Sequence, residues 1–216
     1  MNSRIAAVVM ALAAAAAAPA AAVELVVDAH DADGRALSQV VVTVDALPRV
    51  GPPPVADTAT VDQVNRTFDP HVSVIPQGTA VLFPNRDDIR HHLYSFSEAK
   101  TFELPLYKGT PAEPIVFDKA GIVTLACNIH DWMLAYVYVT DARWSAVTGA
   151  DGRADFTLPD HDRYRVTVWH PSLGPDTEGM VHELERGDGA LELMVELEPT
   201  AQRGTRRLRR GAGRYR

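Results

Sequence analysis

Residues 117–133 read FDKAGIVTLACNIHDWM and contain the single cysteine of the chain, Cys127. The apolar run Ile122–Ala126 follows a Lys-Ala-Gly turn, which predicts a short β-strand. A thiol, an imidazole and a thioether come directly after this strand, from Cys127, His130 and Met133. A loop that leaves a strand can curl three side chains at this spacing around one point. The stretch therefore predicts a β-strand that ends in a metal site.

Short strands separated by turn residues continue over residues 66–140. Pro76-Gln77-Gly78 and Pro84-Asn85-Arg86-Asp87 are turn signals, and no stretch here has helical periodicity. The expected strands are Val72–Ile75, Ala80–Phe83, His91–Phe96, Ile115–Phe117, Ile122–Ala126 and Ala135–Val139. Short strands at regular spacing predict an all-β sandwich over residues 66–140.

Further β structure is expected on both sides of this sandwich. Residues 23–44 alternate and predict two strands joined through Asp31-Ala32-Asp33-Gly34, and four prolines make residues 48–57 a linker. The strands expected after residue 140 are Ala154–Leu158, Tyr164–Trp169 and Gly189–Leu197. We therefore divide the chain into an N-terminal β segment with its linker (23–65), the sandwich (66–140) and a C-terminal β region (141–200). The last of these is expected to be β-sandwich-like and to pair with residues 23–47.

The two ends of the chain have distinct compositions. Residues 1–22 combine Arg4 with an alanine-rich apolar run that stops at Pro19, which predicts a secretory signal peptide and a periplasmic protein. That run is too short and too rich in alanine to hold a bilayer, so stable membrane insertion is not expected after cleavage. Residues 201–216 carry seven arginines and no acid, and predict a basic disordered tail. The formal net charge of −7 argues against a general nucleic-acid binder.

The single cysteine limits the metal chemistry. It excludes an intrachain disulfide and any zinc site with two thiolates. An unpaired thiol in an oxidising compartment is a liability unless a metal holds it as a thiolate. Two imidazoles and a thiolate in one plane with a weak axial thioether form the ligand set of a type 1 (blue) copper site. Zinc gains little from a thioether and prefers tetrahedral closure, so copper is favoured.

The first imidazole comes from the pair His91-His92, at the start of an expected strand. Strand alternation places the two side chains on opposite faces and does not choose between them. We predict one copper ion held by Cys127, His130, Met133 and one of these two histidines.

Two stretches of the chain resemble the two halves of cupredoxins of the plastocyanin and amicyanin type. They are VSVIPQGTAVLFPNRDDIRHHLYSF at residues 72–96 and FDKAGIVTLACNIHDWM at residues 117–133, and the Cys-x-x-His-x-x-Met spacing is similar to the short form seen in amicyanin. The resemblance implies a Greek-key β-sandwich and one type 1 copper ion. It also implies His91 as the first ligand. Asn85, His92 and Asn128 would then lie around the ligands and brace or tune them.

The flanking segments resemble a carboxypeptidase-regulatory-like (transthyretin-like) β domain. ELVVDAHDADGRALSQVVVTV at residues 24–44 is similar to its opening half, and AVTGADGRADFTLPDHDRYRVTVWHP at residues 146–171 to its closing half. The resemblance implies that the copper domain is inserted within such a fold.

The predicted function is single-electron transfer with a redox partner protein that binds transiently. A non-redox copper-binding or copper-delivery protein of the cell envelope is the main alternative, and a β-domain adhesion or assembly protein is a third. An enzyme is not expected, because four protein ligands leave no open coordination position. The sequence shows no phosphate loop, dinucleotide fingerprint or nucleophile motif. Asp87-Asp88 is interpreted as a turn, and the other five histidines as surface residues: His30, His71, His161, His170 and His182.

Overall fold

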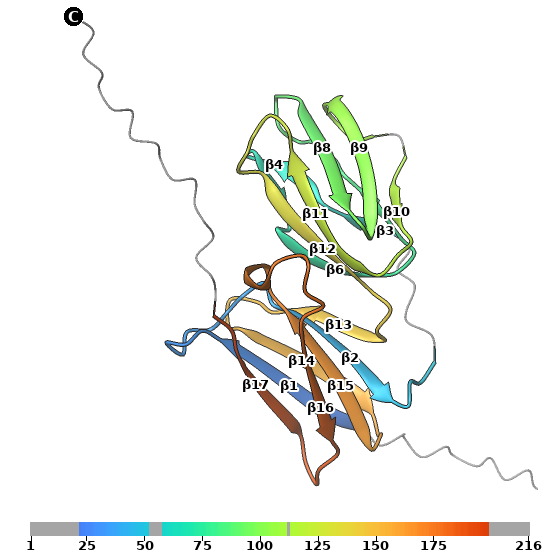
Figure 1. Ribbon diagram of the computed structural model, residues 1–216, viewed down its shortest axis with the longest axis vertical. Helices are drawn as coiled ribbons and strands as arrows, with labels where there is room; N and C mark the ends of the chain where they lie inside the picture. The colour runs from blue at the N-terminus through green and yellow to red at the C-terminus, as the bar shows by residue number, and fades with distance from the viewer. Residues whose placement is uncertain (1–21, 52–57, 112, 199–216) are drawn as a thin grey trace, which may run out of the picture.

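The computed structural model describes residues 22–51, 58–111 and 113–198. Two β-sandwiches lie end to end along the long axis (Figure 1), and the predicted all-β class is confirmed. Among the described residues the single helical element is a short 3-10 helix, η1 (Pro171–Leu173). No helix in this part of the chain is long and apolar enough to cross a bilayer. The predicted signal peptide, up to residue 21, and the predicted tail lie outside the described residues, as does the middle of the linker (52–57).

One sandwich is built from both ends of the described chain, and we call it the flanking sandwich. Its two sheets have the strand orders β14-β1-β17 and β13-β2-β15-β16. Strand β1 pairs antiparallel with β14 and parallel with β17, and β2 pairs antiparallel with β13 and β15. The strands are β1 (Ala22–His30), β2 (Val41–Leu47), β13 (Trp144–Val147), β14 (Arg153–Pro159), β15 (Arg163–Trp169), β16 (Met180–Glu185) and β17 (Leu191–Glu196).

The core of the flanking sandwich follows from strand alternation. Every second residue of β1 from Val23 points inward, and valines and leucines of the facing strands close over them. Residues 23–44 form two strands, as predicted, but β1 and β2 belong to different sheets and do not pair with each other. Asp31 and Gly34 do form a turn, but Ala36 then bridges back to His30 and the chain crosses to the second sheet.

The other sandwich is inserted between β2 and β13, and we call it the inserted sandwich. A five-stranded sheet of order β6-β12-β11-β8-β9 is one layer, and a three-stranded sheet of order β10-β7-β3 is the other, with a separate β4–β5 hairpin. The strands are β3 (Thr58–Thr60), β4 (Asp62–Val64), β5 (Thr67–Asp69), β6 (Val72–Pro76), β7 (Thr79–Leu82), β8 (His91–Ser97), β9 (Lys100–Tyr107), β10 (Ile115–Phe117), β11 (Gly121–Cys127) and β12 (Leu134–Thr140).

The inserted sandwich starts earlier than the predicted residue 66. Its first strand, β3, pairs parallel with β7, and the expected boundary falls inside the two-residue turn between β4 and β5. Strands of three residues carry too little periodicity to be recognised in a sequence. The sequence did not indicate strand β9, because Lys100, Glu103 and Pro105 interrupt its pattern. It lies at the edge of the five-stranded sheet, where a proline is tolerated.

A small apolar cluster joins the two sandwiches. Its buried members are Val41 and Trp169 of the flanking sandwich and Val72 and Tyr136 of the inserted sandwich. The rings of Tyr136 and Trp169 meet edge to face with centroids 5.5 Å apart. The metal-ligand candidates lie elsewhere, toward the far end of the inserted sandwich.

Candidate metal centre

Three donor atoms converge at one end of the inserted sandwich. The Nδ1 atoms of His91 and His130 each lie 3.9 Å from Sγ of Cys127, and all the donor atoms of the group lie within 4.8 Å of one another. His91 is fully buried, Cys127 is 4% exposed and His130 is partly exposed. Within residues 22–51, 58–111 and 113–198, these three residues form the one group of His, Cys, Asp or Glu side chains close enough together to hold a metal ion.

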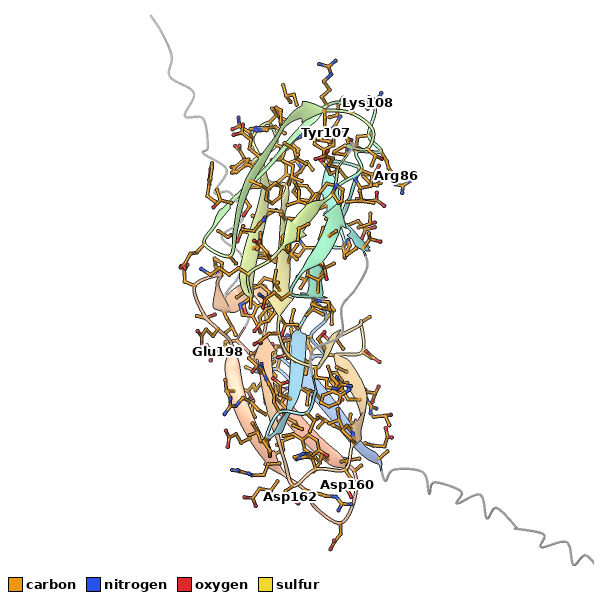
Figure 2. All side chains as sticks on the ribbon, turned by 90° about the vertical axis from the view of Figure 1, so that its right-hand side faces the viewer. Arg86, Tyr107, Lys108, Asp160, Asp162 and Glu198 are labelled. Carbon is orange, nitrogen blue, oxygen red and sulfur yellow. The ribbon has the colours of Figure 1, made fainter. Side chains whose placement is uncertain are left out.

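Strand direction explains why residues so far apart in sequence meet here. β8 and β11 are antiparallel neighbours, with Cys127 opposite Leu93, so the first residue of β8 lies beside the last residue of β11. Tyr107, opposite His91 on β9, marks this end in Figure 2, far from Asp160 and Asp162 at the opposite end of the molecule.

The loop after β11 is closed by backbone hydrogen bonds. The N–H of Met133 donates to the carbonyl of His130 (2.9 Å), and the N–H of Cys127 donates to the carbonyl of Met133 (3.3 Å). Met133 is buried, with 2% of its surface exposed. The six-residue connection thus returns Met133 to the base of the loop, next to the backbone of Cys127.

Asp87 fixes the orientation of His91. Its Oδ2 accepts a hydrogen bond from Nε2 of His91 at 2.7 Å, which holds the ring with Nδ1 directed at Cys127. Burial raises the pKa of Asp87, but hydrogen bonds from His91 and from the backbone of Arg66 and Asn65 outweigh it and hold the pKa below its usual value. The interpretation of Asp87 as a turn residue was therefore incomplete, because its contact with His91 requires the tertiary structure.

His92 points away from the cluster. Its Nε2 is 2.8 Å from Oε1 of Glu103 on β9, and its ring lies near that of Tyr94 on the outer face of the sheet. The carbonyl of His92 accepts a hydrogen bond from the N–H of Asn128 at 3.3 Å. His92 and Asn128 thus tie β8 to the loop through backbone atoms, and the side chain of Asn128 is exposed rather than directed at the cluster.

Asn85 is a buried junction beneath the site. Its side-chain N–H groups donate to the carbonyls of Ile89 and Tyr107, each at 2.9 Å, and its Oδ1 accepts from the N–H of Asp87 at 3.0 Å. Two further backbone hydrogen bonds join Asn85 to Gly109. The predicted supporting position of Asn85 is therefore filled by a side chain that braces the segment leading to His91.

His130 carries an exposed aromatic neighbour that the sequence analysis did not single out. The ring of Trp132 lies 5.1 Å from that of His130 and is 64% exposed, and Ile129 is also exposed. Partial burial, reinforced by the neighbouring His91 and Arg66, lowers the pKa of His130. The imidazole is therefore held neutral, which is the form that binds a metal.

Gln63 and Tyr107 form a second set of polar side chains near the cluster. Gln63 is fully buried and donates to the hydroxyl of Tyr107, which in turn donates to the carbonyl of Phe83 at 2.7 Å. Burial, together with the charge of the Cys127 thiolate, raises the pKa of Tyr107 to about 12. Tyr107 is therefore a neutral hydrogen-bond donor near the cluster.

A β-bulge gives Tyr107 its inward direction. The register between β8 and β9 shifts between His91 and Leu93, so that Pro105 and Leu106 face His92 alone. The extra residue reverses the alternation of β9, and Leu106 becomes exposed while Tyr107 turns inward. No sequence pattern signals this reversal.

The donor spacing would allow the three groups to hold one metal ion. With metal–nitrogen and metal–sulfur distances of about 2.0 and about 2.3 Å, a trigonal arrangement separates sulfur from nitrogen by about 3.7 Å and a tetrahedral one by about 3.5 Å. The two sulfur–nitrogen distances of 3.9 Å are slightly longer than both values, so the three groups lie within reach of one ion. One soft sulfur and two imidazoles suit copper.

Several solved structures are similar to part of this chain. A purple cupredoxin from Nitrosopumilus maritimus is 23% identical over 38% of this chain and 99% of its own, with a TM-score of 0.34. A mutant of amicyanin in its reduced Cu(I) form is 23% identical over 46% of this chain and 98% of its own, with a TM-score of 0.35. The chain resembles cupredoxins. This agrees with the resemblance predicted from the sequence.

A copper-containing nitrite reductase from Thermus scotoductus SA-01 is also similar, with 29% identity over 43% of this chain and a TM-score of 0.35. The match covers 23% of the reductase chain, so it concerns a small part of that enzyme. No protein-family model and no curated protein sequence matches the chain. The predicted resemblance of the flanking segments to a carboxypeptidase-regulatory-like domain therefore stays a prediction.

Three of the remaining histidines have defined structural partners, and the first is His30, whose Nδ1 lies 3.1 Å from the carbonyl of Asp31. Nδ1 of His71 lies 2.8 Å from the carbonyl of Leu134, and the side chain of His170 accepts from the N–H of Ser172 at the start of η1. None of the three belongs to a metal-binding group in the described part of the chain.

Proposed function

We propose that the protein is a type 1 copper protein of the periplasm that transfers single electrons between redox partners. The observation that carries the proposal is the convergence of Cys127, His91 and His130, with sulfur 3.9 Å from each nitrogen. Met133, buried at the base of the same loop, is the proposed axial ligand. The bound copper ion supplies one-electron chemistry by alternating between Cu(II) and Cu(I).

The protein holds the three donor residues in a fixed arrangement. Two of the three donors lie at the ends of neighbouring strands of one sheet, and the third lies in a loop closed by hydrogen bonds. A scaffold of this kind changes little when the charge at its centre changes, which keeps electron exchange fast. The lowered pKa of His130 favours its neutral imidazole, and the hydrogen bond from His91 to Asp87 holds the His91 ring with Nδ1 toward Cys127.

The route for the electron leads through His130. It lies at the partly exposed edge of the cluster, and Trp132 and Ile129 present apolar surface beside it. A redox partner that docks there through a small interface would come close to the copper and dissociate again quickly. Four protein ligands leave no position for a substrate, so we expect electron transfer without catalysis.

Loading the purified protein with Cu(II) tests this proposal. We expect an intense blue or green colour that ascorbate bleaches reversibly. A pale protein that loses copper rapidly to a chelator would instead support copper delivery. A colourless protein whose Cys127 is freely alkylated would contradict both.

Paired substitutions of the two adjacent histidines test the ligand choice. We expect His91→Ala to abolish the colour and His92→Ala to retain it, because the side chain of His92 bonds to Glu103 on the outer face. The reverse result would show that His92 is the ligand.

A further inference from the structure

The turn between β4 and β5 contacts two residues that lie beside the candidate ligands, Asp87 next to His91 and Trp132 next to His130. It consists of Asn65 and Arg66, whose φ angles are 54° and 58°, so both residues adopt the left-handed conformation of a type I′ turn. Asparagine suits this conformation, whereas glycine is the usual residue at the second position. A specific set of contacts therefore stabilises an arginine in this place.

Asp87 provides the first contact. Its Oδ1 accepts from the N–H of Asn65 at 2.7 Å, and its Oδ2 accepts from the N–H of Arg66 at 2.9 Å. The same Oδ2 accepts from Nε2 of His91 at 2.7 Å. The carboxylate is 12% exposed, so water competes weakly for these hydrogen bonds. One side chain thus holds the turn and a proposed copper ligand together.

Trp132 provides the second contact. Its Nε1–H donates to the carbonyl of Arg66 at 3.2 Å, and its ring packs beside that of His130. A pocket of about 420 Å³ lies beside this contact and is lined by Asn65, Trp132 and Met133 among others. The hydrogen bond from Trp132 therefore joins the turn to the metal loop at the edge of a hollow.

The base of the hairpin is itself anchored. The N–H of Gln63 donates to the carbonyl of Pro84, and the N–H of Arg86 donates to the carbonyl of Gln63, each at 2.9 Å. The guanidinium of Arg86 also bonds to Asp62 at 2.9 Å. The strand that leads into the turn is therefore anchored to the segment before Asp87, independently of the metal loop.

We infer that the Asn65-Arg66 turn is a positioning element that couples the two imidazole ligands, through Asp87 to His91 and through Trp132 to His130. This inference rests on the proposed copper function. Because the two ligands share one anchored turn, neither imidazole shifts without disturbing the contacts of the other. The turn thereby limits the rearrangement of the site when an electron arrives or leaves.

Copper retention and electron exchange of four proteins test this coupling. They are Asp87→Asn, Trp132→Phe, the double variant and the control Asp88→Asn, which makes the same charge change at the adjacent exposed carboxylate. Phenylalanine keeps an aromatic ring beside His130 and removes the N–H. Each copper-loaded variant is mixed with a chelator to measure copper loss, and its visible spectrum, reduction potential and electron self-exchange rate are recorded.

We expect Asp87→Asn to lose copper about 10- to 100-fold faster than Asp88→Asn, because groups that orient a metal-binding histidine contribute on this scale. Its reduction potential should rise, since removal of the nearby negative charge destabilises Cu(II) more than Cu(I). Trp132→Phe should lose copper a few-fold faster than Asp88→Asn and slow self-exchange several-fold, with little change in the potential. The double variant should lose copper more slowly than the product of the two single effects predicts, because both changes release the same turn.

Each alternative result has a defined meaning. A double variant whose effect equals the product of the single effects would overturn the coupling, as would two single variants that match Asp88→Asn. If Asp87→Asn does not fold, Trp132→Phe decides alone, and an unchanged self-exchange rate in that variant would overturn the inference. A wild-type protein that stays colourless with Cu(II) would contradict the proposed function instead.

Discussion

The flanking sandwich and the inserted sandwich share the same strand alternation but bury different kinds of side chain. The core of the flanking sandwich is formed by aliphatic and aromatic side chains such as Leu25 and Val166. The flanking sandwich also buries polar side chains, among them Asp45 and Thr148. The inserted sandwich differs in that it gathers a buried imidazole, His91, with Asn85 and Gln63 at one end. Buried polar groups cost free energy unless they are paired, so a fold retains them where they serve a purpose. The comparison separates a region that provides stability from a region that carries chemistry.

Substitution of Cys127 should have the largest effect on function. We expect Cys127→Ser to remove the intense visible absorption completely, because a serine hydroxyl is not a soft ligand for copper. Visible absorption of the Cu(II)-loaded variant measures this effect, and circular dichroism checks that the β fold remains. Full absorption in the variant would contradict the assignment of the thiolate.

Substitution of Trp169 should break the connection between the two sandwiches. Trp169 is fully buried in the apolar cluster that contacts Tyr136. We expect Trp169→Ala to destabilise the protein by about 3–5 kcal/mol and to separate thermal unfolding into two transitions in calorimetry. A single transition at the wild-type temperature would show that the cluster does not couple the sandwiches.

A cavity in the flanking sandwich should leave the metal site intact. Leu25 is fully buried in the core of that sandwich. We expect Leu25→Ala to cost about 2–5 kcal/mol of unfolding free energy, measured by urea titration. The visible spectrum of the copper-loaded variant should match that of the wild type, in contrast to Cys127→Ser. A shifted spectrum would mean that the two regions are not separate in function.

The smallest expected effect concerns the two connections between the sandwiches. Arg49, after β2, bonds to Asp141, after β12, at 2.9 Å, and this bond lowers the pKa of Asp141 below 3.8. Both side chains are about half exposed, so the pair contributes about 0.2–1 kcal/mol. Because the pKa of Asp141 is lowered by folding, the contribution is present above pH 3.8 and disappears as the pH falls through the folded value.

Unfolding free energies of the wild type and of Asp141→Asn, measured at pH 7 and near pH 3, check this expectation. The difference between the two proteins should be present at neutral pH and become smaller near pH 3. High salt should reduce it at neutral pH. A difference that persists undiminished in acid would mean that Asp141 acts through something other than its charge.

Residue spacing alone located much of the inserted sandwich and its site. Cys127, His130 and Met133 fall within seven residues at the end of a recognisable strand, so their proximity is a local property of the chain. The alternation of β8 placed His91 and His92 on opposite faces but did not indicate which face was inside. That choice required the sheet partners of β8, since β11 and β9 determine which face covers the core.

The groups that surround the cluster could not be predicted in the same way. Asp87 is four residues from His91, but its contact with the Asn65-Arg66 turn joins segments that no local pattern connects. Tyr107 turns inward because of a bulge, and Trp132 acquires its role through a carbonyl of a hairpin too short to be recognised.

The sequence by itself determined the β class and the local grouping of Cys127, His130 and Met133 at the end of a strand, because alternation and short-range spacing are properties of neighbouring residues. Only the tertiary structure decided which histidine faces the thiolate and which groups hold it there. It also decided that β1 and β2 each pair with a strand more than a hundred residues away in the sequence. Strand pairing and burial depend on segments distant in the chain, and the free energy of those contacts is realised when the whole fold is assembled.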